Sequence, residues 1–166
     1  MSTRNLTMVV NRQHAENHEL GFAAPPSVYA DKSYVNMYLH HDGYPQWQGV
    51  QLANWCKANA RQDGSAIAAK LVHDMYYDSC YLYAHPDRID HNYTYIIWTG
   101  KDDIWISCYD QYTSTNVFVM QPDRIIERYK DDMDYTDFSN GETRWNKAKK
   151  IDGLYHAKQL VDLFTN

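Results

Sequence analysis

Hydrophobic residues recur with two periods along this chain, one typical of strands and one typical of helices. Alternating apolar and polar residues, rich in aromatic and β-branched types, predict strands at 34–40, 80–83, 93–98, 104–109 and 116–120. Apolar residues spaced three or four apart predict helices at 45–60, 65–75, 121–129 and 155–164. Short connections join the last three strands, which favours an antiparallel meander.

These elements predict an α+β domain over residues 31–166, built on an antiparallel sheet of about four to five strands with helices packed on one face. Residues 1–30 are expected to form an irregular N-terminal arm with at most one short strand, at 6–10. Pro25 and Pro26 explain this expectation, because neither fits inside a helix or a central strand. Such an arm is expected to fray or to dock on a partner subunit.

The strand at 34–40 has two unlike faces, because successive side chains point to opposite sides of a sheet. The apolar face, which should meet the helices, carries Val35, Met37 and Leu39. The other face carries Tyr34, Asn36, Tyr38 and His40. An aromatic face with hydrogen-bonding groups suits a stacking platform for nucleobases or a protein interface. The alternative is that the tyrosine rings are buried and only their hydroxyls reach water.

The turn after this strand is the second candidate region, since it leads from a strand to the N-terminus of a helix. Backbone N–H groups and the helix dipole favour an anion there, and His40, His41 and Tyr44 could add donors to a phosphate or nucleotide. The simpler interpretation is that Asp42 and Gly43 form the turn and Asp42 caps the helix. The predicted ligand-binding residues are Tyr34, Tyr38, His40, His41, Asp42, Gly43 and Tyr44.

Composition limits the classes of partner. The chain has 166 residues, 15 of them tyrosine, and a net charge of −5, so broad binding of nucleic acid is not expected. It contains no apolar run of membrane-spanning length, and we expect a soluble protein with no membrane partner. No three metal ligands share a local spacing, so neither a metal site nor a cofactor is expected. The cysteines, Cys56, Cys80 and Cys108, are expected to be buried thiols.

The segment His40-His41-Asp42-Gly43-Tyr44-Pro45 resembles a motif of small uncharacterised bacteriophage proteins. In those proteins a strand ends in His-Trp-Asp-Gly-Tyr-Pro and a glycine-containing helix follows. Gly49 matches the helix glycine, whereas His41 stands where the family usually has an aromatic residue. The resemblance covers roughly residues 34–110. It implies a phage protein made in the host bacterial cytoplasm, and it implies no activity.

We therefore expect a phage accessory protein that binds a host protein or a small nucleotide-like ligand without catalysis. Counteracting host defence is a purpose that the resemblance suggests. One alternative is a small hydrolase or nuclease with His40 or His41 as the base and Asp42 nearby. Another is a virion or assembly component that docks through residues 1–30. The aromatic surplus also favours homo-oligomers. No catalytic residue is assigned, because no complete catalytic motif is present.

Overall fold

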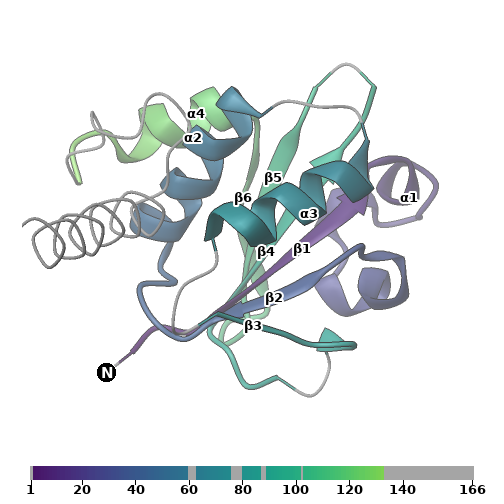
Figure 1. The fold of residues 1–166 in the computed structure, drawn as a ribbon, viewed down its shortest axis with the longest axis horizontal. Coiled ribbons are helices and arrows are strands. Elements are labelled where there is room, and N and C mark those ends of the chain that lie inside the picture. Colours follow the sequence, from purple (N-terminus) through teal and green to yellow (C-terminus); the bar gives the residue numbers. More distant parts are fainter. Residues whose placement is uncertain (1, 60–62, 76–79, 87–88, 102, 133–166) are drawn as a thin grey trace, which may run out of the picture.

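The computed structural model of the protein describes residues 2–59, 63–75, 80–86, 89–101 and 103–132 (Figure 1). These residues form an α+β fold around one sheet, which confirms the predicted fold class. The helix predicted at 155–164 lies outside the described residues.

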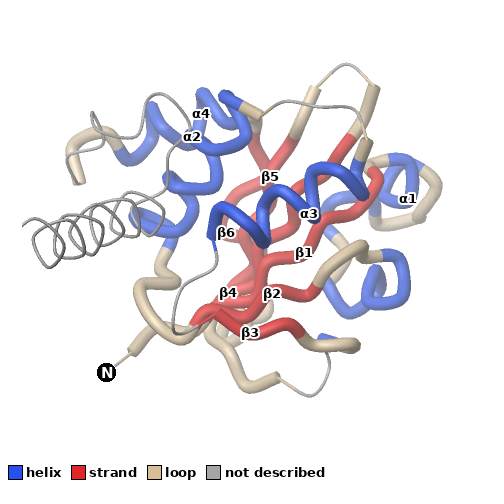
Figure 2. The backbone as a smooth tube through the Cα atoms, viewed as in Figure 1, coloured by secondary structure: helices blue, strands red, loops and turns tan. Residues whose placement is uncertain are grey.

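The sheet has six strands in the order β3-β2-β1-β4-β5-β6 (Figure 2). Their bounds are β1 (Asn5–Asn11), β2 (Asn36–Leu39), β3 (Cys80–Leu82), β4 (Tyr93–Thr99), β5 (Trp105–Asp110) and β6 (Thr115–Met120). The last three form the predicted antiparallel meander. The sheet is nevertheless mixed, because β1 pairs with β4 in parallel, from Asn5 opposite Tyr93 to Asn11 opposite Thr99. The prediction of an antiparallel sheet of four to five strands is therefore wrong in this detail.

The N-terminal segment is part of the sheet and not an arm outside it. β1 lies between β2 and β4, and its residues from Asn5 to Val10 are all buried. The short strand predicted at 6–10 is thus confirmed, but as a central strand. Its central position depends on pairing with β4, which lies far along the chain, and local sequence carries no signal for such a pairing.

Three helices cover one face of the sheet: α2 (Val50–Ala58), α3 (Gly64–Met75) and α4 (Pro122–Tyr129) (Figure 1). A one-turn π-helix, η3 (Pro45–Gly49), leads into α2. Met37 and Leu39 of β2 pack in the core beneath these helices, and Val35 packs against it. The predicted apolar face of 34–40 is therefore confirmed. All three cysteines are free and buried, as expected.

The opposite face is covered by the segment that follows β1. It contains α1 (Gln13–Glu16), η1 (Gly21–Ala23) and η2 (Pro26–Lys32). Tyr29 donates its hydroxyl to the carbonyl of Gly21 at 2.7 Å, and its ring meets the Trp98 ring edge-on, with centroids 4.9 Å apart. Helical segments therefore lie on both faces, because aromatic side chains after β1 supply a second, smaller core.

Candidate functional site

Three of the predicted site residues lie together at the carboxyl end of β2: the buried Tyr38, the half-buried His40 and the exposed His41. The Tyr38 hydroxyl lies 2.7 Å from Nδ1 of His40, and the rings of His40 and His41 meet edge-on with centroids 4.7 Å apart. β3 adds two rings, since Tyr81 and Tyr83 lie with centroids about 6 Å from that of Tyr38. We call these five residues the aromatic patch. β3 was predicted as a strand, but only its register with β2 shows that it completes this patch.

Tyr34 does not belong to the aromatic patch. It precedes β2, and its N–H donates to the carbonyl of Val9 at 2.9 Å. Its ring lies against Gly64, at the start of α3, on the side of the sheet that the helices cover. Strand alternation had placed Tyr34 with Tyr38, but the strand begins only at Asn36, so the alternation does not extend that far.

The Asp42-Gly43-Tyr44 turn has a structural role. Asp42 adopts a left-handed backbone with φ of 53°, and no side chain caps the following η3, so the expected Asp42 cap is absent. The N–H of Gly43 donates to the carbonyl of Thr3 at 2.8 Å, and the Tyr95 hydroxyl donates to the carbonyl of Gly43 at 2.6 Å. Gly43 is buried and its backbone groups are paired, which leaves its N–H no capacity for a phosphate.

A cleft of about 350 Å³ opens on the face opposite α2 and α3, and it is the candidate ligand site. Its walls come from β1, from the residues around η2, from the loop before β4, and from β4 and β5. The lining residues are Leu6, Met8, Pro25, Pro26, Ser27, Pro86, Ile89, His91, Thr94, Tyr109 and Gln111. The lining combines apolar residues with the polar side chains of Ser27, His91, Thr94 and Gln111, and ligand sites in proteins commonly place a few polar groups among apolar ones.

The polar groups of the cleft form one chain of hydrogen bonds. Nδ1 of His91 lies 2.7 Å from the carbonyl of Ile89, which can only accept, so Nδ1 carries the proton. Nε2 then accepts from the hydroxyl of Thr94 at 2.6 Å. The side-chain amide of Gln111 donates to the same Thr94 oxygen at 2.7 Å. The side-chain carbonyl of Gln111 takes no part in this chain of hydrogen bonds, and it supplies an acceptor at the cleft.

The loop that carries His91 is tied to the start of β1. The N–H of Arg4 donates to the side-chain oxygen of Asn92 at 2.9 Å, and the N–H of Asn92 donates to the carbonyl of Arg4 at 2.9 Å. The Arg4 guanidinium also pairs with Asp90 at 3.0 Å. These contacts hold the imidazole in place before any ligand arrives, which reduces the entropic cost of binding.

This geometry favours binding over nucleophilic catalysis. Thr94 already donates to His91 and accepts from Gln111, so one of its oxygen lone pairs is engaged by a donor. The other ring nitrogen of His91 faces the carbonyl of Ile89, so no carboxylate orients the imidazole as the third group of a catalytic triad does. None of the described residues that line the cleft is Asp, Glu, Lys or Arg, so this part of the cleft suits a ligand that is uncharged where it is buried.

Burial lowers the pKa of His91, although the carbonyl of Ile89 and the charge of Asp90 act in the opposite sense. In the folded protein, His91 therefore stays neutral at a pH at which the same histidine binds a proton in the unfolded chain. We expect the free energy of unfolding to fall as the pH drops below the ordinary histidine value of 6.5, with a slope of at most about 1.4 kcal/mol per pH unit from this group. Above that pH His91 should not change the free energy of unfolding.

Urea unfolding between about pH 7.5 and 5.5 checks this expectation. The His91→Gln variant, which cannot titrate in this range, should show a flatter profile than the unmodified protein. The exposed His41 serves as the matched control, and His41→Gln should keep the unmodified profile. Identical profiles for His91→Gln and the unmodified protein would contradict the prediction.

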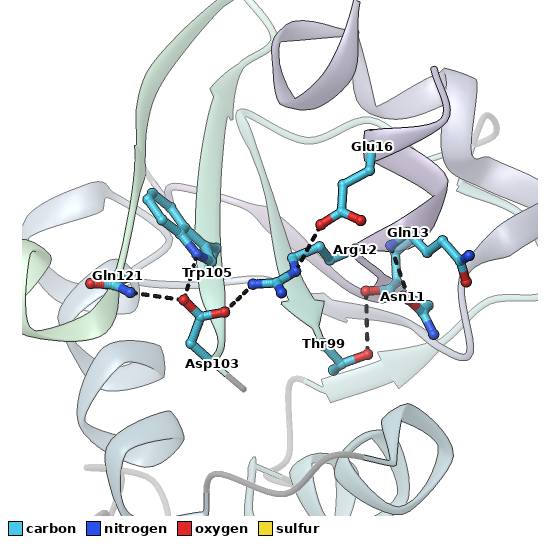
Figure 3. Close-up of polar contacts among 9 residues, drawn as sticks. Asn11, Arg12, Gln13, Glu16, Thr99, Asp103, Trp105 and Gln121 are labelled. Carbon is cyan, nitrogen blue, oxygen red and sulfur yellow. Dashed lines mark hydrogen bonds and ion pairs between the residues drawn. The ribbon is translucent and has the colours of Figure 1, made fainter. Parts of the chain in front are cut away.

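A second crevice, of about 390 Å³, lies at the carboxyl ends of the parallel strands β1 and β4. Figure 3 shows Arg12 between two carboxylates: its Nε lies 3.0 Å from Glu16, and its other end pairs with Asp103. Asp103 also accepts from Trp105 at 3.1 Å and from Gln121 at 2.9 Å. Arg12 is thus engaged in joining β1 to the loop before β5, and the cleft is the better candidate site.

Within the described ranges, no three His, Cys, Asp or Glu side chains are placed to hold a metal ion. None of the helices described here is long and apolar enough to cross a membrane. Comparisons with models of protein families, with curated proteins and with solved structures find no match to this chain.

Proposed function

We propose that this protein is a non-enzymatic binding protein that takes the base of a nucleoside or nucleotide into the cleft. The observation that carries the proposal is the chain of hydrogen bonds from Gln111 through Thr94 to His91 at one side of the cleft. The volume of about 350 Å³ falls within the range of small-ligand pockets, roughly 300–1,000 Å³.

The chemistry of the cleft supports a planar heterocycle. Leu6 and Met8 of β1 and the neighbouring prolines offer apolar surfaces for the faces of a base. The side-chain carbonyl of Gln111 offers an acceptor for an N–H on the edge of the base. A phosphate is expected to remain outside the cleft, because none of the described lining residues is cationic.

The biological setting is proposed on the resemblance of residues 40–45 to the phage motif. On that basis the protein serves a bacteriophage as an accessory protein in the host cytoplasm, and removal of a nucleotide from a host defence is a purpose consistent with binding without turnover. The described positions of His40, His41 and Asp42 do not favour the hydrolase alternative: Nδ1 of His40 is engaged with Tyr38 and Asp42 lies in a strained turn.

Isothermal titration with adenosine, guanosine, cytidine and uridine tests the proposal. We expect at least one nucleoside to bind with a Kd below about 1 mM. Gln111→Leu should weaken that binding about tenfold or more, because it removes both the acceptor and the support of Thr94. Gln13→Leu is the matched control, since Gln13 lies at the second crevice, and it should leave binding unchanged.

Two results would count against the proposal. One is the absence of binding for all four nucleosides at millimolar concentration. The other is a nucleoside whose affinity is equally reduced, or equally preserved, by Gln111→Leu and Gln13→Leu, because binding would then not depend on the cleft.

A further inference from the structure

The direction of each hydrogen bond in the cleft is determined by the bond before it. The carbonyl of Ile89, 2.7 Å from Nδ1 of His91, can only accept, so the single proton of the neutral ring lies on Nδ1 and leaves Nε2 as an acceptor. The Thr94 hydroxyl, 2.6 Å from Nε2, must therefore donate its one proton to the imidazole. The Thr94 oxygen keeps only lone pairs, so the Gln111 side chain has to meet it with an amide N–H, at 2.7 Å.

The Gln111 amide is consequently held in one of its two orientations. Turning it over would place two acceptors, the Gln111 carbonyl and the Thr94 oxygen, against each other. The backbone of Gln111 is fixed as well, because its N–H donates to the carbonyl of Asn92, next to His91, at 2.9 Å. Among the described residues no donor meets the Gln111 side-chain carbonyl, so this oxygen remains as an acceptor for a ligand.

Burial makes these directions costly to reverse. Thr94 is only 1% exposed, and burial lowers the pKa of His91, which keeps the imidazole neutral. A donor or acceptor left unpaired in such surroundings loses its hydrogen bond to water and gains none from the protein. A single arrangement of the chain from Ile89 to Gln111 therefore predominates.

We propose that His91 and Thr94 are positioning residues: they fix the Gln111 carbonyl as the acceptor of the cleft, and the cleft thereby selects a heterocycle with an N–H on its buried edge. This inference rests on the proposed function and narrows its ligand class. Adenine and cytosine supply the N–H from an amino group, and guanine and uracil from the ring. A base that has only acceptors would set one of them against the Gln111 oxygen, and both would lose their bonds to water.

Two ribosides whose bases have no N–H test this selection in the unmodified full chain. Purine riboside and pyrimidin-2-one riboside are smaller than the natural nucleosides, so weaker binding cannot result from a steric clash. In isothermal titration, purine riboside is compared with adenosine and guanosine, and pyrimidin-2-one riboside with cytidine and uridine. The riboside without an N–H should have a Kd at least about tenfold higher than the nucleoside that binds. We call this ratio of Kd values the donor preference.

Substitutions of Thr94 separate positioning from simple structural support. Thr94→Val removes the hydroxyl, so the Gln111 amide can turn either its carbonyl or its amino group to the ligand, and the donor preference should fall close to one. Thr94→Ser retains the hydroxyl and should retain the donor preference. A structural defect alone would weaken both ligands equally and leave the ratio unchanged. Circular dichroism of each variant verifies that it is folded.

Nitrogen NMR of the ligand-free protein supplies a readout that needs no substitution. At about pH 7.5 the His91 ring should be neutral and should carry its proton on Nδ1. A proton on Nε2 overturns the inference. So does a nucleoside that binds without a donor preference, a preference that persists in Thr94→Val, or one that Thr94→Ser loses as fully as Thr94→Val. These outcomes leave the proposed function standing, whereas the absence of binding for all four nucleosides refutes that function and this inference together.

Discussion

Replacing Gly43 by alanine is expected to lower the free energy of unfolding by about 3 kcal/mol, a large part of the stability of a domain of this size. A Cβ atom at this position would lie 2.7 Å from the carbonyl oxygen of Thr3 and 2.8 Å from the Asn5 side chain. Thr3 contributes a backbone atom and Asn5 begins the central strand, so neither can move without displacing β1.

The same displacement would weaken the contacts that hold the turn. Gly43 donates to Thr3, and the fully buried Tyr95 donates to the carbonyl of Gly43, so both bonds depend on the close approach of the two backbones. Urea unfolding measures the loss. Gly100→Ala is the control, because a Cβ there meets the end of the flexible Arg12 side chain, and a smaller loss is expected. If Gly43→Ala were as stable as Gly100→Ala, the turn would not have the structural role described here.

Replacing Asp74 by leucine should also cost about 3 kcal/mol, because it leaves a buried indole N–H without its acceptor. Nε1 of Trp55 donates to Asp74 at 2.8 Å, and Trp55 is fully buried between α2 and α3. Lys70 adds a charged bond to the same carboxylate at 3.0 Å. Burial raises the pKa of Asp74, but hydrogen bonds from His73, Trp55 and Lys70 outweigh it and hold the pKa below its usual value.

A double-mutant cycle separates the Trp55 contact from the other effects. Trp55→Phe removes the indole N–H, so Asp74→Leu should cost less in the Trp55→Phe background than in the unmodified protein. His73→Ala is the control, because the His73 side chain is 86% exposed and its bond to Asp74 is open to solvent. Equal costs of Asp74→Leu in both backgrounds would show that the hydrogen bond contributes nothing to stability.

Local periodicity predicted most elements because each depends on residues close together in the sequence. The apolar stripe at 67, 68, 71, 72 and 75 predicted α3 nearly to the residue, and alternation predicted the strands of the meander. The predicted start at residue 65 is one residue late, because α3 begins at Gly64. The N–H and hydroxyl of Ser65 both donate to Asp63, the residue before the helix.

The candidate site was predicted only in part. Tyr38, His40 and His41 lie together because they are neighbours in sequence. The cleft was missed. His91 and Thr94 are three residues apart, which is a weak signal, and Gln111 comes from the turn after β5. Only the pairing of β4 with β5 brings Gln111 to Thr94.

The sequence by itself determined the α+β class, the apolar face of the strand at 34–40, the glycine at a tight turn and the buried thiols. Each of these depends on residue type and short-range spacing, which the chain carries locally. The tertiary structure decided that β1 is central and parallel to β4, that residues 13–32 cover the second face, and that a polar-edged cleft forms beside them. These features arise from contacts between distant segments, whose free energy depends on how well whole surfaces pack together.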